Sequence, residues 1–453
     1  MKTKSTKIKA RIRRLVKSIG PNRSIKALSG AAVLWTFLPN DGSPASEIHH
    51  TFRREAWREA SVGDRMFLCL GFVLWAPTTM YLAVTFTRRC GPEVRARTGK
   101  GLLRQLREQL GLALRVAVPP PWYYMFEFFD DAKRRRAAEY LYRFETKAAL
   151  YDFLRAKLSA PEVYEPLSDK ALFATHCEAG GVRAVRSLGT VIDGTIRQAD
   201  GSDGLPCQHM FFKPIRGAGG HGAERWMLQD DGSYQGGDGA VMSATDLHAH
   251  AVELSRQEPY VIRELLTQHR DIADLSAGAL CTARVVSVLD ENGQPEVTNA
   301  VLRMASDASA VVDNFHAGGI AAEIDLGNGK LTRATSMGLT GHTSWYDVHP
   351  ATGGVVTGRQ LPFWSEILQL TRSAHELFPG YPAIGWDVAI LDDGPCLVEG
   401  NKSPDLDILQ RIGRRPLGNE RYGQLFLFHL RRALDTVHDT GRTSSPPGLE
   451  DVA

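Results

Sequence analysis

The sequence predicts an α+β protein with an α-helical N-terminal region. From about Pro161 onward, short β-branched runs such as VVSVL and DVAIL alternate with Gly and Asp turns and two further helical stretches, which is typical of α+β structure. Residues 31–160 instead show apolar residues at helical spacing and alternating charge. The length of 453 residues exceeds that of one ordinary core, which predicts a catalytic body with an accessory segment.

The first thirty residues differ in charge from the rest of the chain. Residues 1–30 contain ten Lys or Arg and no acid, so the formal charge of +3 divides into +10 there and −7 elsewhere. We interpret residues 1–30 as a basic flexible arm, for which a solvated tail is the usual structure and contact with anionic lipid or nucleic acid the alternative. No other stretch resembles a nucleic-acid surface, so no nucleic-acid partner is predicted.

A long apolar run lies within the helical region. Residues 66–86, MFLCLGFVLWAPTTMYLAVTF, carry no charge and are flanked by Arg65 on one side and Arg88 and Arg89 on the other. The run is long enough to cross a bilayer. It also contains Gly71 and is basic on both sides, which favours a helical hairpin that is buried or lies on a membrane surface. Both interpretations remain open.

The rest of the helical region and the C-terminus follow from periodicity. Leucines at spacings of three and four predict a helix over 95–115, and alternating charge predicts helix over 130–158. Pro119 to Pro121 must interrupt helical structure between them. Apolar periodicity fades after about Arg431, so we expect a catalytic domain over 161–432 and a disordered tail over 433–453.

The cysteines indicate a compartment. Six cysteines are scattered without CxxC pairs, which supports neither a disulfide framework nor a structural zinc site and fits a reducing cytoplasm. The short apolar run after the basic arm does not resemble a cleavable signal peptide.

A glycine-rich loop follows a candidate strand in FFKPIRGAGGHGAERW, residues 211–226. Backbone N–H groups of such a loop can surround phosphate oxygens, and Lys213 adds a positive charge beside them. Because the lysine precedes the glycines, the loop is not a Walker A motif. A plain glycine-rich hairpin turn is the alternative. The loop glycines are Gly217, Gly219, Gly220 and Gly222.

A late hairpin carries the sharpest signal. Two alternating runs flank the turn Asp392-Asp393-Gly394, and counting outward from the turn places Asp387 opposite Glu399. Two opposed carboxylates repel each other unless a cation or a shared proton lies between them. Asn401 falls on the same strand face as Glu399, giving an all-oxygen set suited to Mg²⁺. A surface hairpin with solvated acids is the alternative.

Two further stretches hold polar groups at strand ends. The strand in EPYVIRELLTQH ends in Glu264, an acid that can hold a ribose hydroxyl or simply enter a loop. Arg284 heads the strand ARVVSVL, and Asp313, Asn314 and His316 gather in a later turn. A catalytic base at His316 is the less favoured reading, because a lone loop histidine more often serves as a hydrogen-bonding residue.

In this order the blocks resemble the ATP-grasp superfamily, and most closely its sugar-transfer-associated domains, which are related to alpha-L-glutamate ligases. The resemblance covers about 161–430 and implies two α+β lobes with the nucleotide between antiparallel sheets. No partner domain for sugar transfer is visible, so the resemblance does not imply glycosyltransferase activity. The matching segments are LSDKALFATHCEAGGV, FFKPIRGAGGHG, YVIRELLTQH, TARVVSV, VVDNFHAGGIAAEIDL and GWDVAILDDGPCLVEGN.

The resemblance also implies roles for single residues, with ATP and Mg²⁺ as cofactors and Mn²⁺ as an alternative metal. It assigns Lys170 and Lys213 to the phosphates, Gly217 to Gly222 to a flexible lid, and the hinge acid Glu264 to the ribose. It assigns Arg284 and Asn314 to the transferred phosphate or the acceptor. It assigns the acid pair Asp387 and Glu399, with Asn401, to the metal.

The implied reaction is that of an ATP-dependent carboxylate-amine ligase. A substrate carboxylate attacks the γ-phosphate to give an acylphosphate, which an amine or thiol then displaces. The substrates would be small or glycan-linked acids and amines in polysaccharide or cell-envelope synthesis, at the inner face of the cytoplasmic membrane. Two alternatives remain: a kinase acting on a sugar or polyol hydroxyl, and a noncatalytic nucleotide-binding module. No oligomeric state is predicted.

Overall fold

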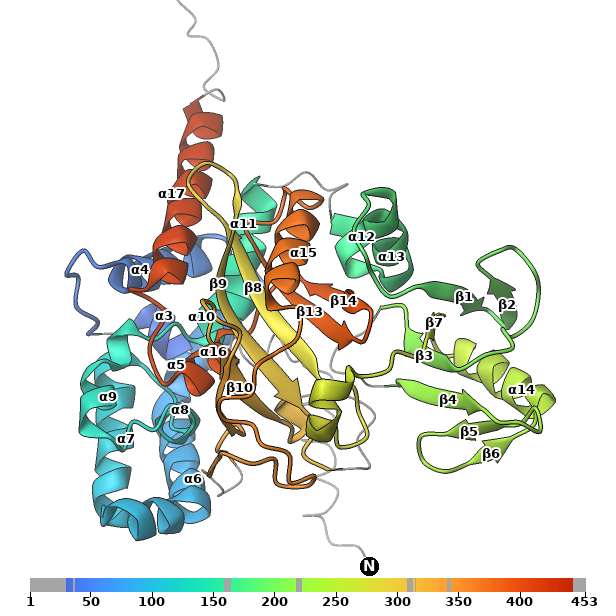
Figure 1. Cartoon of the computed structure of the whole chain (residues 1–453). Coiled ribbons are helices and arrows are strands. Elements are labelled where there is room, and N and C mark those ends of the chain that lie inside the picture. Colours follow the sequence, from blue (N-terminus) through green and yellow to red (C-terminus); the bar gives the residue numbers. More distant parts are fainter. Residues whose placement is uncertain are drawn as a thin grey trace, which may run out of the picture. The chain divides into compact units, whose positions relative to one another are not determined.

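The chain forms two compact units, which Figure 1 shows with their elements labelled. The computed structural model describes residues 30–35, 37–158, 164–216, 222–307, 313, 315–339 and 344–442. The helical unit comprises residues 1–159 and 415–453, and the central unit comprises residues 160–414. The basic arm over 1–29 and the last eleven residues of the expected tail lie outside the described residues.

Two helices of the helical unit, α4 and α5, begin at serine side-chain caps. Ser43 caps α4, where Pro44 occupies the first turn, and Ser61 caps α5 through the backbone N–H of Asp64. α6 ends at Gly99, whose φ of 72° suits a residue without Cβ. The described helices of this unit are α3 (Gly30–Leu34), α4 (Pro44–Arg58), α5 (Val62–Val73), α6 (Trp75–Thr98), α7 (Leu102–Val116), α8 (Pro121–Met125), α9 (Asp131–Arg135), η1 (Ala137–Glu139), α10 (Arg143–Glu145), η2 (Thr146–Leu150), α11 (Tyr151–Leu158) and α17 (Arg421–Arg442).

The stretches 95–115 and 130–158 are helical as expected, and the structure shows where their helices begin and end. α6 ends at Gly99 and α7 begins after Gly101, so 95–115 is divided between two helices. The stretch 130–158 is made of several short helices. Residues 433–442, expected in a disordered tail, continue α17, and Arg431 of that helix pairs with Glu47 at 2.6 Å. Residues 415–432, expected in the catalytic domain, therefore belong with the helical unit.

The apolar run over 66–86 forms a bent helix pair. α5 and α6 meet at an angle of 61° around Leu74. In the part of the chain that the structure describes, no single helix is long and apolar enough to cross a membrane, whereas this bent pair meets the length and composition requirement together.

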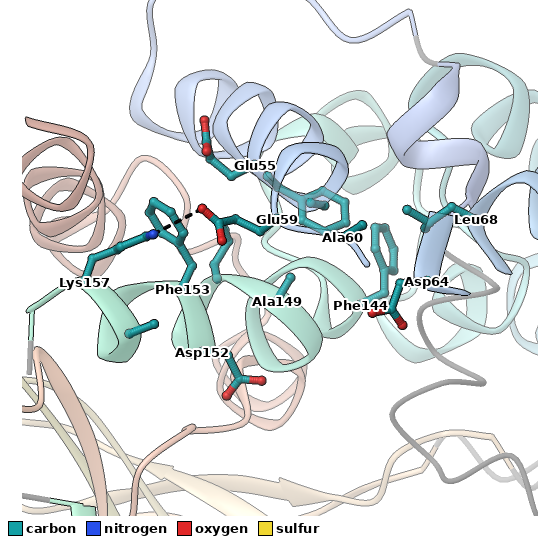
Figure 2. A pocket seen from close by; sticks show the side chains of 14 residues that line it. Glu55, Glu59, Ala60, Asp64, Leu68, Phe144, Ala149, Asp152, Phe153 and Lys157 are labelled. Carbon is teal, nitrogen blue, oxygen red and sulfur yellow. Dashed lines mark ion pairs between the residues drawn. The ribbon is translucent and has the colours of Figure 1, made fainter. Parts of the chain in front are cut away.

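A cavity of about 230 Å³ lies in the helical unit, as Figure 2 shows. Its walls are apolar, with Phe144, Phe153 and Leu68 among them. Its rim is acidic, but Glu59 pairs with Lys157 at 3.2 Å, which offsets charge at the entrance. The polar groups of this cavity do not indicate a particular ligand.

The first sheet of the central unit has the order β2-β1-β7-β3-β4-β5-β6, and its paired strands are antiparallel. Its core includes Phe212, Trp226 and Ile262 together with Leu247 of α14. The elements are β1 (Ser187–Ile192), β2 (Thr195–Gln198), β3 (Met210–Pro214), β4 (Glu224–Leu228), β5 (Tyr234–Gly236), β6 (Val241–Met242), α14 (Ala244–Ser255) and β7 (Tyr260–Glu264), with α12 (Tyr164–Ser168) and α13 (Lys170–Ala179) before them.

The second sheet has the order β12-β11-β10-β9-β8-β13-β14, again with antiparallel pairs. Trp386 lies fully buried beside Phe378, and its indole N–H donates to Ser287 at 2.8 Å. The elements are η4 (Arg270–Leu275), β8 (Thr282–Leu289), β9 (Pro295–Met304), η5 (Phe315–Ala317), β10 (Ile320–Ile324), β11 (Leu331–Thr335), β12 (Trp345–Tyr346), α15 (Trp364–Glu376), β13 (Ala383–Leu391), β14 (Gly394–Asn401) and α16 (Leu406–Gly413).

Candidate nucleotide and metal site

A lysine of the first sheet meets an acid of the second sheet. Lys213 lies on β3, and its ammonium group is 2.6 Å from a carboxylate oxygen of Glu399 on β14. Both side chains are largely buried, with 16% and 22% of their surface exposed. Since the two residues lie 186 positions apart in the sequence, the folded central unit brings together the candidate phosphate lysine and a candidate metal ligand.

Asp387 and Glu399 lie opposite each other on β13 and β14, which confirms the predicted pairing. The ladder reaches this register through a bulge. The strands pair Leu391 with Gly394 and Val388 with Leu397, and Val398 is then an extra residue before Glu399. A regular ladder would have placed Val398 opposite Asp387, so the bulge moves the carboxylate into place.

Asn401 lies beside Asp387 on the neighbouring strand. Its side-chain amide nitrogen is 3.5 Å from the Asp387 carboxylate. Gly400, between Glu399 and Asn401, has no room for a side chain, because an added Cβ would lie 2.5 Å from Leu167 and 3.0 Å from Trp386. The backbone of β14 therefore packs closely on the core while its two polar side chains line a cavity.

Two arginines surround Asp387. Arg284 of β8 forms a bidentate ion pair with the Asp387 carboxylate. The guanidinium group of Arg303 on β9 lies 3.0 Å from the same carboxylate. Burial alone would raise the pKa of Asp387, but Arg284 and Arg303 outweigh it and hold the pKa at about 2. Arg303 also pairs with Asp313 at 3.1 Å, and Asp313 accepts a hydrogen bond from the backbone N–H of Thr282. Asp387 is therefore anionic at neutral pH.

Lys170 begins α13 and lines the same cavity of about 170 Å³ as Glu399 and Asn401. Burial lowers the pKa of Lys170 to about 8, although Glu399 opposes that shift. For Glu399 itself, burial raises the pKa, but Lys213 and Lys170 more than offset burial and lower it. Arg263 of β7 donates to the backbone carbonyl groups of Lys170 and Val398, so it joins α13 to β14 at the wall of the cavity.

Glu264 ends β7 and accepts a hydrogen bond from the backbone N–H of Arg186 at 2.9 Å. Just beyond it, Leu266 is one of several partly buried apolar residues that pack on a small cluster containing Val185 and Cys396. Leu280 and Val398 belong to the same group. An acid beside an apolar surface is suited to a ribose with a planar base.

The structure does not place every predicted residue. Gly217, Gly219, Gly220 and Asn314 lie outside the described residues. Gly222 has a φ of 71°, and a Cβ there would lie 2.8 Å from the Tyr260 hydroxyl. His316 lies apart from the contacts above and pairs with the buried Asp405 at 2.9 Å.

The donor set fits magnesium. Two carboxylates and one amide come from neighbouring strands, and such oxygen donors leave coordination positions for phosphate and water. Within the described ranges, no group of three or more His, Cys, Asp or Glu side chains could hold a metal. A metal at Asp387 and Glu399 would therefore need ligands from a bound anion as well.

Sequence reasoning missed Arg263, Arg303 and Lys402. Arg263 and Lys402 line the cavity, and the Lys402 ammonium group donates to the Ser168 hydroxyl at 2.9 Å. Arg263 and Arg303 interrupt strands that are otherwise apolar, VIRE and AVLRM. A buried arginine in an apolar strand needs an acid or carbonyl partner, which is the signal that could have identified both.

The fold and the site together define an ATP-grasp protein, with two antiparallel sheets and a cationic cavity that includes groups from both. Within that class, the chain belongs to the sugar-transfer associated ATP-grasp family, whose model matches residues 151–420. The match covers more than half of the chain and includes the candidate site residues.

The solved structures that match this chain have low sequence identity to it, and the search of curated proteins found no match. D-alanyl-alanine synthetase A from Vibrio cholerae O1 biovar eltor str. N16961 is 11% identical, with a TM-score of 0.36 over 61% of this chain and 68% of that one. N5-carboxyaminoimidazole synthase from Aspergillus clavatus is 13% identical, with a TM-score of 0.32 over 60% and 53%. L-amino acid ligase from Bacillus licheniformis is 10% identical, with a TM-score of 0.32 over 59% and 49%. The chain thus spans about half the length of the latter two.

Proposed function

We propose that the central unit is an ATP- and Mg²⁺-dependent ligase that activates a substrate carboxylate as an acylphosphate for attack by an amine or thiol. The observation that carries the proposal is the meeting of Lys213 with Glu399 beside Asp387. Membership of the ATP-grasp family supports the nucleotide. An ATP- and Mg²⁺-dependent ligase needs cationic groups for the phosphates and carboxylates for the metal, and the site holds groups of both kinds.

Asp387, Glu399 and Asn401 would hold Mg²⁺, and Mn²⁺ has similar preferences. When bound, the metal would supply positive charge to the phosphate oxygens of the nucleotide. Lys170 and Lys213 would bind those phosphates, and Glu264 would hold the ribose. Arg284 and Asn314 are proposed to contact the transferred phosphate or the acceptor.

The cationic groups explain how the chain itself would favour phosphoryl transfer. Arg284 and Arg303 fix the Asp387 carboxylate in one orientation and keep it anionic. Lys213, held by Glu399, would supply positive charge as negative charge develops on the γ-phosphate. The loop over 217–222 is proposed to act as a lid that excludes water from the reactive acylphosphate.

We also propose a setting for this activity. The substrates are proposed to be small or glycan-linked acids and amines of polysaccharide or cell-envelope synthesis, in keeping with the family description. The basic N-terminal residues support a position at the inner, cytoplasmic face of a membrane, where anionic lipids attract Lys and Arg.

The test is ADP release by the purified chain with Mg-ATP and a panel of carboxylates, with hydroxylamine as a trap. An acylphosphate yields a hydroxamate, whereas a kinase that phosphorylates a hydroxyl does not. Glu399→Ala should lower turnover about 100-fold or more, the scale of losing one electrostatic stabiliser. Asp393→Asn is the matched control, because Asp393 lies on the same hairpin with its side chain 72% exposed. Equal turnover by the wild type and Glu399→Ala would disprove the metal assignment.

A further inference from the structure

We propose that the bend between α5 and α6 is a membrane-inserting elbow that lies in one leaflet of an anionic bilayer without crossing it. This inference rests on the membrane association proposed above and specifies which residues enter the lipid. It does not depend on the ligase reaction.

The elbow exposes large apolar side chains on both of its helices. Met66 and Val73 of α5 are 69% and 72% exposed, and Tyr81 of α6 is 69% exposed. Phe72, Leu74 and Met80 lie between them and are also exposed. Single exposed apolar residues are normal, but a run of them around one bend marks an interaction surface.

The charge around the elbow selects the partner. No acidic residue occurs between Asp64 and Glu93, whereas Arg65, Arg88 and Arg89 lie in that interval. An apolar surface bordered by these arginines matches the acyl region and the anionic headgroups of a lipid leaflet. A second copy of the chain would bring the same basic border and is therefore a poorer match.

The basic arm is joined to the elbow. α3 begins at Gly30, where an added Cβ would lie 2.3 Å from the backbone oxygen of Leu68 in α5. α3 therefore packs closely on α5, the first helix of the elbow. All ten basic residues of 1–30 precede Gly30 in the sequence, so the arm is proposed to add its charge to that of the elbow.

Aromatic residues flank the bend. Trp35 packs edge-on against Trp75, with ring centroids 5.1 Å apart, and also against Phe37, with centroids 5.3 Å apart. Phe37 is 66% exposed. Tryptophan and other aromatic rings are favoured at the headgroup level of a bilayer. Together with the 61° bend, this favours a shallow position in one leaflet over a span.

Two native cysteines provide a direct test. Cys69 lies on α5 in the elbow, Cys207 lies in the central unit, and both are exposed. The full-length chain is treated with a water-soluble maleimide, alone and with phosphatidylcholine vesicles that contain or lack 30% phosphatidylglycerol. Anionic vesicles should slow labelling of Cys69 about tenfold or more relative to Cys207, as expected for burial of a thiol in lipid. Equal slowing of both cysteines, or of neither while the protein is bound, would overturn the proposal.

Vesicle sedimentation of full-length variants separates the contributions. Met66→Glu with Val73→Glu should weaken binding about tenfold or more at low and high salt, because charged groups enter lipid poorly. Arg13→Glu with Arg14→Glu should weaken binding to anionic vesicles by a similar factor at low salt only. Val348→Glu with Val355→Glu is the control, since both residues are exposed in the central unit, and it should bind as the wild type does.

Self-association is the competing outcome. If the elbow variant changes the sedimentation coefficient of the free protein and leaves vesicle binding intact, the surface joins two copies and the lipid assignment is wrong. These assays need no ATP turnover, so failure of the ligase proposal would not affect them. An active enzyme that does not bind vesicles would contradict the membrane proposal and leave the ligase proposal intact.

Discussion

Lys213 and Glu399 come from different sheets of the central unit, and their side chains meet at 2.6 Å. The lysine neutralises a carboxylate that is proposed to hold the metal. Binding of Mg-ATP would then let each group exchange its partner for a phosphate or a metal, so the pair keeps both side chains in position for the ligand.

The Lys213 ammonium group should be essential for turnover. Lys213→Met removes the charge nearest to Glu399 and should lower kcat about 100- to 1000-fold, the scale of losing one preorganised charge at a reacting group. Lys330→Met, at an exposed lysine of the same unit, is the matched control and should keep kcat. Steady-state ADP release measures both variants, and a Lys213→Met enzyme with normal kcat would remove the lysine from the reaction.

Nucleotide binding should weaken as the pH rises through about 8. Burial gives Lys170 a pKa of about 8, so its ammonium group is charged below that pH and neutral above it. Phosphate favours the charged form, which places the midpoint at or above this value. Calorimetric titration of Mg-ATP from pH 6.5 to 9.5 should show about tenfold loss of affinity, the worth of one charged hydrogen bond.

Lys170→Met is the control for that pH profile. The variant should bind Mg-ATP weakly and without the step above pH 8. A step of the same size in the variant would show that another group causes it.

Arg303 should be needed for stability. Its guanidinium group contacts both Asp313 and Asp387, which are buried. Arg303→Met leaves these acids with less compensation and should lower the free energy of unfolding by about 3–5 kcal/mol. Arg333→Met, at an exposed ion pair with Asp347, should cost about 1 kcal/mol or less. Urea unfolding compares the two variants, and similar losses would contradict the assigned role of Arg303.

Gly400→Ala should disturb the site through packing alone. The added methyl group meets Leu167 and the fully buried Trp386, so β14 must shift, at a cost of about 1–3 kcal/mol in stability. Because Glu399 and Asn401 flank this position, the affinity for Mg-ATP should fall as well. Gly111→Ala is the control, because Gly111 lies in α7 with open space around it, and it should keep both the stability and the affinity for Mg-ATP. Gly239→Ala would be unsuitable, because Gly239 has a φ of 88°.

The sequence predicted which residues form the candidate site better than it predicted the contacts between them. The opposed acids on the late hairpin followed from the turn and from strand alternation, but the actual register depends on the bulge at Val398, which no local signal identifies. Arg303 could not be linked to Asp387 because that contact joins β9 to β13 across β8. Such cross-strand partners depend on strand order, which a single sequence does not contain.

The helical unit was harder to predict for a different reason. Helical periodicity continued through Gly99, where backbone conformation rather than side-chain pattern ends α6. At the other end of the chain, α17 continues past the point where the apolar pattern fades. Weak patterns can remain helical when the preceding turns are packed on a neighbour, as Arg431 is with Glu47.

The cavity and the ion pairs beside it bring together six basic residues, Lys170, Lys213, Arg263, Arg284, Arg303 and Lys402, and three acids, Asp313, Asp387 and Glu399. A divalent ion arriving by itself would add to this excess of positive charge and would have to displace Lys213 from Glu399. The order of arrival follows: free Mg²⁺ should give no heat of binding with the empty enzyme, whereas the polyphosphate chain would carry its metal in and supply the missing negative charge.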